Sequence, residues 1–409
     1  MNIDVVSQLI AEDGVDALIS TEPVLAIADK GLSATYKDKT FQSGDTIHIR
    51  VEDQPKMPAQ SNVMQVDPIV QGEIPVTVLQ YNDGVPIAGI EQEYFLGGEE
   101  RIRERISRPR MKNMAVQASI LCYNELGTSM NFFGTPGTPL KTAEDWGFGQ
   151  ALLNDQLAMD DGLYAIMSNR SMAETSGDLA KAFNPTTESA TAYMKGRVKM
   201  AANLNFFSSS NIPNHLNGSA VGTGAAGMKL AVNPATGATS FTVSGGTANG
   251  TLTKNTIIWF SAVRAVQPNT KKTLSTLRYF TVAADATLDG AGAGVITTTE
   301  PVYGPENAKL QNASILPTTA QFVGVVGAAN TLYEQAFVCK KNAFAFIGLP
   351  LPDLYSLNNK RASYEGVDVH VTSFGDGTNY INMIRWDILC ASKIRQWRHV
   401  ARAYTRAIS

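Results

Sequence analysis

The chain has 409 residues, which is enough for two or three domains and a substantial buried core. Charged residues make up 17% of it, and 34 basic residues against 37 acidic ones give a formal net charge of −3. The hydrophobic content of 44% argues against general disorder. The near-neutral charge argues against a nucleic-acid reader that depends on an overall basic excess.

The cysteines and the apolar runs exclude further classes. Cys122, Cys339 and Cys390 lack the spacing of a zinc ribbon, and three cysteines cannot form a closed disulfide set. No basic segment followed by an apolar one opens the chain, so we expect no signal peptide. Apolar runs such as 257–260 fall far short of the roughly 20 residues that span a bilayer. We expect a protein of a reducing compartment with no membrane partner.

Residues 1–45 form a predicted N-terminal arm. Apolar residues at helical spacing lie before Pro23, and a second apolar run follows at 24–27. The arm is therefore expected to contain one or two short helices, interrupted at the proline.

Residues 46–85 form a predicted extended hairpin loop. Alternating apolar and polar residues predict a strand over 46–51 and a second one near 74–79. The polar stretch between them is either a disordered insertion or an arm that lies on a neighbouring subunit, and we favour the arm. Three residues of this stretch are candidates for a subunit interface: Pro55, Lys56 and Pro58.

A long helix is predicted from about residue 99 to Leu126, before a stop at Gly127. Pro109 must break or kink it. Its start, 101–112, which we call the basic stretch, carries six cations and one acid. The basic stretch is either a solvated face balanced by acids elsewhere or a surface that meets another subunit or a polyanion. Four of its residues are candidates for a subunit interface: Arg101, Arg103, Arg105 and Arg108.

Residues 86–220 are expected to hold this helix and the first part of an α/β core. Thr142, followed by two acids, predicts the start of a second helix. A strand is predicted over 163–167 and a helical patch over 176–183.

The composition changes at about residue 220, where charge becomes sparse and Gly, Thr, Ala and Ser dominate. Short β-type runs separated by turn signals such as Asn233-Pro234 predict an inserted all-β domain over 221–315. Its expected strands are 228–232, 240–243, 256–263, 277–282 and 294–298.

Residues 316–409 are expected to return to the α/β core. A helix is predicted over 331–341, and strands over 343–347, 367–371 and 381–389. After Asp387 the chain has no acid but five cations: Lys393, Arg395, Arg398, Arg402 and Arg406.

Local motifs predict no catalytic, cofactor or metal site, although residues distant in the sequence could still assemble one. The G-x-G-x-x-G match at 222–227 precedes a predicted strand and not a helix, so it is expected to be a linker. The four histidines lack the spacing of a metal-binding helix face. Asp160-Asp161 could pair as an acid couple, but such neighbours more often end a helix in solvent.

The order of these parts and three stretches of sequence carry a resemblance. The stretches are 202–207 with Asn211-Ile212-Pro213, then 257–260 with 266–271, and then 330–333 with 343–347 and 349–352. The chain resembles the major capsid (coat) proteins of tailed phages, in the P22-like branch of the HK97-like fold.

The resemblance implies an α+β, HK97-like capsid fold with an N-arm, an extended loop, a spine helix, peripheral and axial domains and an inserted all-β domain. It implies a structural protein without cofactors and not an enzyme. Many copies would form the hexamers and pentamers of an icosahedral shell around double-stranded DNA, which is held without sequence specificity. Expected partners are a scaffolding protein and a portal, and the expected locations are the virion and, during assembly, the host cytoplasm.

Two other functions stay open from the residues alone. The Gly- and Thr-rich segment would also suit another phage structural subunit, such as a tail tube or fibre. The size and mixed α/β pattern would suit a hydrolase with a β-rich accessory domain.

Overall fold

A computed structural model describes residues 23–36, 39, 41–51, 64, 72–88, 106–158, 162–182, 200–220, 227–307, 309–352, 358–364, 367–376 and 381–408. The chain divides into two compact units. Unit 1 comprises 1–50, 73–125 and 342–395, and unit 2 comprises 51–72, 126–341 and 396–409. No helix within the described ranges is long and apolar enough to cross a membrane.

Unit 1 is built on a five-stranded sheet around β21 (Ile381–Ile394). One edge of β21 pairs antiparallel with β3 (Leu79–Ala88). Its other edge pairs first with β20 (Val367–Asp376) and then with β18 (Phe344–Leu349). The sheet continues from β20 to β19 (Asn358–Tyr364). Because β21 is 14 residues long, two shorter strands fit one after the other along the same edge.

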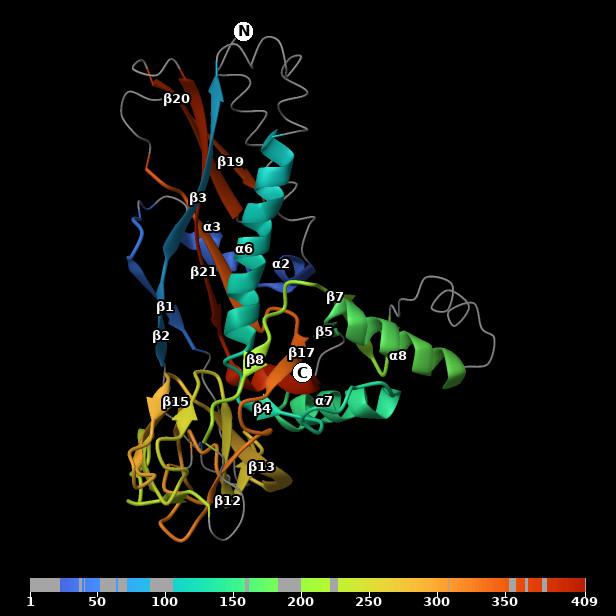
Figure 1. Ribbon diagram of the computed structural model, residues 1–409, viewed down its shortest axis with the longest axis vertical. Coiled ribbons are helices and arrows are strands. Elements are labelled where there is room, and N and C mark those ends of the chain that lie inside the picture. The colour runs from blue at the N-terminus through green and yellow to red at the C-terminus, as the bar shows by residue number, and fades with distance from the viewer. Residues whose placement is uncertain are drawn as a thin grey trace. The chain divides into compact units, whose positions relative to one another are not determined.

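The predicted long helix is α6 (Arg108–Leu126), which lies along this sheet (Figure 1). Arg110 near its start contacts Asp83 of β3, which faces Trp386 of β21. Glu125 near its end pairs with Lys393 of β21 at 3.2 Å. The stretch of α6 from Arg110 to Glu125 is about 23 Å long. The stretch of β21 from Trp386 to Lys393 has about the same length. The helix therefore runs in the same direction as β21.

The proline predicted to break this helix lies at its beginning. A π-helical turn at 106–107 precedes Arg108, where regular α-helix begins, and Pro109 is the second residue of α6. In the first turn of a regular helix the missing N–H of proline leaves no hydrogen bond unmade. The helix type changes between residues 107 and 108, just before Pro109, and the helix beyond Pro109 carries no further proline.

The rest of unit 1 packs on β18 and β21. The described part of the predicted arm contains the helices α2 (Pro23–Ile27) and α3 (Gly31–Tyr36). The helical spacing before Pro23 lies outside the described residues, so the interruption predicted at this proline stays a prediction. β1 (Thr46–Arg50) and β2 (Glu73–Thr77) form the predicted antiparallel pair. Their apolar side chains join one core with those of β18 and β21. The polar stretch between the two strands lies outside the described residues apart from position 64.

Unit 2 contains a seven-stranded sheet of mixed direction, in which β5 is parallel to β7 and β22 is parallel to β4. β8 pairs with β17 beside the main strand order. In sheet order the strands are β4 (Asn131–Phe132), β22 (Val400–Ile408), β17 (Leu332–Lys340), β5 (Leu163–Met167), β7 (Leu204–Ser208) and β6 (Met200–Ala201), with β8 (His215–Leu216).

Two helices accompany this sheet. α7 (Ala143–Asp155) begins as predicted, because Thr142 and Asp145 each accept a hydrogen bond from the other's backbone N–H. α8 (Asn169–Ala182) begins earlier than the predicted patch over 176–183. The ring of Trp146 in α7 is fully buried and packs edge-on against Phe206 of β7. This contact ties α7 to the sheet.

The predicted helix over 331–341 is wrong, because these residues form β17. β17 lies between β22 and β5, and residues 335–339 are all buried. A continuous apolar run looks the same in a strand covered on both faces and in a buried helix. The neighbouring strands β22 and β5, which make this segment a strand, come from distant parts of the sequence.

The charge-poor segment is all-β where the structure describes it, as predicted. It forms three small sheets, β15-β10-β9, β11-β14 and β13-β12-β16, and the rings of Phe241, Phe260 and Phe280 meet in its core. The last strand of these sheets, at 323–325, lies beyond the expected end at 315. The strands are β9 (Lys229–Leu230), β10 (Ala238–Ser244), β11 (Thr251–Leu252), β12 (Ile257–Val266), β13 (Thr273–Thr281), β14 (Ala286–Thr287), β15 (Gly294–Val302) and β16 (Val323–Val325).

A stack of three rings lies where β8, β17 and β22 meet. The ring of Tyr404 stacks with those of His215 and Tyr333, with centroids 5.2 Å from each. Nε2 of His215 lies 3.3 Å from the hydroxyl of Thr256. Burial, and then the charge of Arg402, lower the pKa of His215 from 6.5 to about 3. The imidazole is therefore neutral in the folded chain at neutral pH.

We predict that this histidine makes the free energy of unfolding fall as the pH drops below about 6.5. The unfolded chain binds a proton on His215 near that pH, whereas the folded chain binds it only near pH 3, so acid favours the unfolded state. The group adds a slope of up to about 1.4 kcal/mol per pH unit between these values. Urea unfolding between about pH 5.5 and 7, where most carboxyl groups stay ionised, measures the slope.

The matched control is His215→Gln, which keeps a polar side chain beside Thr256 but does not titrate. Its unfolding free energy should change less with pH than that of the wild type. Equal slopes in the two proteins would contradict the prediction, because the other histidines are present in both.

Candidate functional site

Most of the candidate interface residues lie outside the described parts of the chain: Pro55, Lys56, Pro58, Arg101, Arg103 and Arg105. Arg108 is described, and it is the exposed first residue of α6. Asp160, Asp161 and residues 222–226 of the glycine-rich match also lie outside the described ranges. The interface role of the candidate residues stays a prediction.

The described part of the basic stretch is partly balanced within unit 1. The guanidinium of Arg110 donates to the carboxylate of Asp83 and, at 3.2 Å, to the carbonyl oxygen of Gly84. Arg108 and Lys112 are exposed on the same helix. The contact of Arg110 with Asp83 fits a face balanced by acids.

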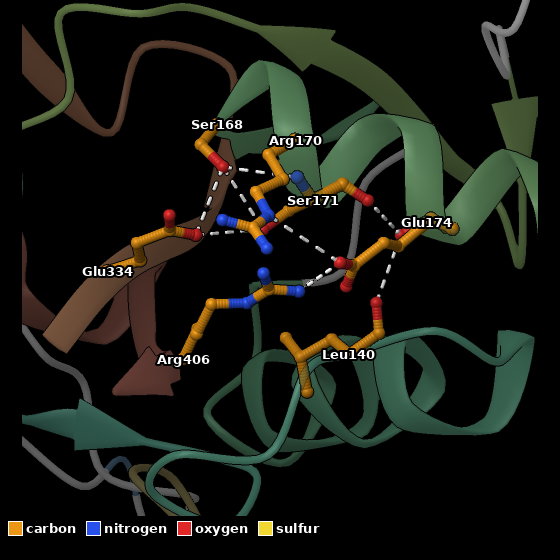
Figure 2. Close-up of polar contacts among 8 residues, drawn as sticks. Leu140, Ser168, Arg170, Ser171, Glu174, Glu334 and Arg406 are labelled. Carbon is orange, nitrogen blue, oxygen red and sulfur yellow. Dashed lines mark hydrogen bonds and ion pairs between the residues drawn. The ribbon is translucent and has the colours of Figure 1, made fainter. Parts of the chain in front are cut away.

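A polar cluster lies in unit 2 where the start of α8 meets β17 and β22 (Figure 2). The carboxylate of Glu334 in β17 accepts hydrogen bonds from the hydroxyls of Ser168 and Ser171, at 3.3 and 3.5 Å. The hydroxyl oxygen of Ser168 also accepts from the backbone N–H of Ser171 at 3.1 Å. Ser168 therefore caps α8 and links its first turn to the sheet.

One turn further along α8, Glu174 extends the same cluster. It pairs with Arg406 of β22 and, at 3.9 Å, with Arg170 (Figure 2). The hydroxyl of Thr175 donates to the carbonyl oxygen of Leu140 at 3.0 Å. Two carboxylates face two guanidiniums, so the cluster balances its own charge. It holds a helix, two strands and a loop together.

A second buried cluster centres on Arg402 in β22, whose exposed fraction is 0%. Its guanidinium donates to the carbonyl oxygens of Gly127 and Asn255, at 2.5 and 2.6 Å, and to the hydroxyl of Thr281 at 3.3 Å. Burial lowers the pKa of Arg402, and the neighbouring Tyr404 opposes this shift. The acceptors belong to the segment after α6, the turn before β12, and β13. One side chain thus ties the last strand to three other segments of unit 2.

A third cluster surrounds Trp397 in the 3₁₀ helix Trp397–His399. The guanidinium carbons of Arg278 and Arg398 lie 4.0 and 5.2 Å from centroids of its ring system. Burial lowers the pKa of Arg278 to about 9 and that of Arg398 to about 10, while the charge of Glu300 raises both. Desolvated cation–π contacts of this kind contribute about 2 kcal/mol. The cluster fastens β13 to the residues just before β22.

These clusters offer structure rather than reactive chemistry. Burial raises the pKa of Cys122 and of Cys339 to about 12 and raises that of Cys390 as well, so all three thiols keep their protons. Thr256 beside His215 is fully buried, out of reach of a substrate. Among the described residues, no three His, Cys, Asp or Glu side chains are placed to hold a metal ion.

The C-terminal cations are evident in the sequence, but the burial of Arg402 was not predicted. A signal was present, because Val400, Ala401, Ala403 and Tyr404 surround it with apolar residues on both faces of the strand. An arginine in such a run must lie inside the protein with internal acceptors. The burial of Arg278 has no such signal in its neighbours, which are mainly polar or aromatic.

Comparison with known proteins gives a family match and one curated relative. The family described as "P22 coat protein - gene protein 5" matches residues 6–397. The major capsid protein of Acyrthosiphon pisum secondary endosymbiont phage 1 is 25% identical over 138 residues, which are 32% of this chain and 33% of that protein. The chain thus matches about a third of the length of this relative.

Two solved structures illustrate the structural likeness. A chain from Mycobacterium phage Che8 has a TM-score of 0.48 at 9% identity, covering 93% of this chain and 90% of that chain. A chain from the capsid structure of Cyanophage P-SCSP1u has a TM-score of 0.42 at 10% identity, covering 90% and 85%.

The described elements combine antiparallel and mixed sheets with a long helix and shorter ones, which confirms the predicted α+β class. The family match extends over nearly the whole length and confirms the resemblance noted in the sequence. The chain belongs to the P22 coat protein family.

Proposed function

We propose that the chain is a major capsid protein with the HK97-like fold, and that its copies form the hexamers and pentamers of an icosahedral shell. The observation that carries this proposal is the family match over residues 6–397. Membership of a coat protein family favours this function over a tail tube or fibre subunit and over a hydrolase.

The proposal assigns a role to each part of the chain. Residues 1–45 would be the N-arm and 46–85 the extended loop, and α6 would be the spine helix. Residues 221–315 would be an inserted domain that stabilises the subunit and its contacts. The segments 86–220 and 316–409 would form the peripheral and axial domains of the capsid core.

The physical demands of a shell agree with these residues. A contact of millimolar affinity is worth about 4 kcal/mol, weak enough to correct errors, and several contacts made together become effectively irreversible. A net charge of −3 limits repulsion between copies. The buried arginine clusters and the cluster at Glu334 would keep each subunit rigid, so that its surfaces meet neighbours in a constant geometry.

The proposed partners follow from this role. A scaffolding protein would guide assembly and a portal would occupy one vertex, while double-stranded DNA would fill the shell without being read by sequence. The subunit would be made in the host cytoplasm and would end in the virion. No cofactor is needed for any of these steps.

We predict that the chain, produced together with its scaffolding protein, forms closed particles tens of nanometres across. Negative-stain electron microscopy of the purified material is the test. Tubes or fibres would support the tail alternative. A protein that stays monomeric under every assembly condition, scaffolding protein included, would contradict the proposal.

We also predict that Arg108→Glu lowers the yield of shells and leaves the melting temperature of the subunit within about 2 °C of the wild type. Arg108 is exposed, so its reversal changes a surface charge and little packing. Particle yield by sedimentation and melting by calorimetry measure the two effects separately.

The control is Lys272→Glu, which reverses an exposed charge between β12 and β13 and changes the net charge equally. An equal loss of shells in both variants would show an effect of net charge alone. A normal yield with Arg108→Glu would favour the solvated-face interpretation of the basic stretch.

A further inference from the structure

The outer edge of β3, meaning the edge that faces away from β21, carries an arrangement that the capsid assignment does not explain. β3 is ten residues long and pairs only with β21 among the strands that the structure describes. A strand edge of this length normally exposes a row of backbone donors and acceptors that can pair with another chain.

Two hydrogen bonds show which residues of β3 face outward. The backbone N–H of Gln80 donates to the hydroxyl of Ser43 at 3.2 Å, and the carbonyl oxygen of Gly84 accepts from Arg110 at 3.2 Å. In an antiparallel pair, alternate residues bond the partner strand and the residues between them point their backbone groups away from it. The even-numbered residues of β3 therefore face the outer edge.

Pro86 is also an even-numbered residue of β3, and its chemistry independently supports the assignment of these residues to the outer edge. A proline has no N–H, so it is tolerated in a strand only where no ladder bond is needed. Its side chain is exposed, and the residue removes one donor from the outer edge. Pro86 lies opposite Met383 of β21, and the pairing of the two strands continues without a break on both sides of it.

At three of the outward positions, one backbone group is thus unavailable to a further strand, each for a different reason. Ser43 occupies the donor of Gln80, Arg110 occupies the acceptor of Gly84, and Pro86 has no donor. Arg110 is also held by Asp83, so its position over the edge is fixed by an ion pair. The three devices come from the segment before β1, from α6 and from β3 itself.

We propose that the outer edge of β3 is protected against the addition of a further strand, so that copies of the chain do not join edge to edge. The protection acts on the single subunit and does not depend on shell formation. In a protein whose copies meet at high local concentration, edge pairing would compete with every correct contact.

The test is Pro86→Val, alone and combined with Arg110→Met. Valine suits a strand and adds a donor at the outer edge, and the second change frees the carbonyl oxygen of Gly84. Purified subunit without scaffolding protein is incubated at rising concentration, and thioflavin T fluorescence and the pelleted fraction are measured. We expect both signals to rise several-fold over the wild type, and further in the double variant.

The matched control is Asn82→Val, which also places valine at an exposed outward position of β3 but adds no new donor. Aggregation no greater in Pro86→Val than in Asn82→Val would overturn the proposal. Circular dichroism and melting verify that each variant is folded. Pro86→Val keeps the ion pair of Arg110, so it decides the question if the double variant does not fold.

Discussion

A buried guanidinium is not hydrated, so its hydrogen-bond acceptors must come from the protein itself. Arg402 is fully buried in unit 2 and is subject to this constraint. The cost of burying such a charge is recovered only if its acceptors are in place. They come from Gly127, Asn255 and Thr281, which lie far from Arg402 in sequence. The last strand β22 and the charge-poor β segment can therefore reach their native geometry only together.

The same logic extends to the neighbouring clusters. Two buried cations lie against the ring of Trp397, and the ring of Tyr404 stacks with those of Tyr333 and a neutral His215. Each contact joins residues around β22 to another segment of unit 2. Under the proposed function a coat subunit would present several weak contact surfaces in constant relative positions. Interior connections of this kind would give it the rigidity that multivalent assembly requires.

Local sequence signals predicted the elements that depend on local physics. The capping pair at Thr142, the alternating strands β1 and β20, and the strands of the charge-poor β segment all have causes within a few residues. β17 was predicted as a helix because its burial on both faces depends on partners remote in the sequence. For the candidate site, the exposure of Arg108 agrees with a surface role, whereas the arginines that organise unit 2 were not predicted. Their acceptors lie on other segments, and no spacing within β22 or β13 identifies them.

The most direct test of the coupling through Arg402 is the free energy of unfolding of Arg402→Met, combined with amide hydrogen exchange. Arg264→Met, which removes an exposed cation from β12, is the control. We expect a loss of about 3 kcal/mol or more, with protection falling in β22 and in β12 and β13 together. A methionine variant as stable as the wild type, or one in which exchange rises in β22 alone, would contradict the account.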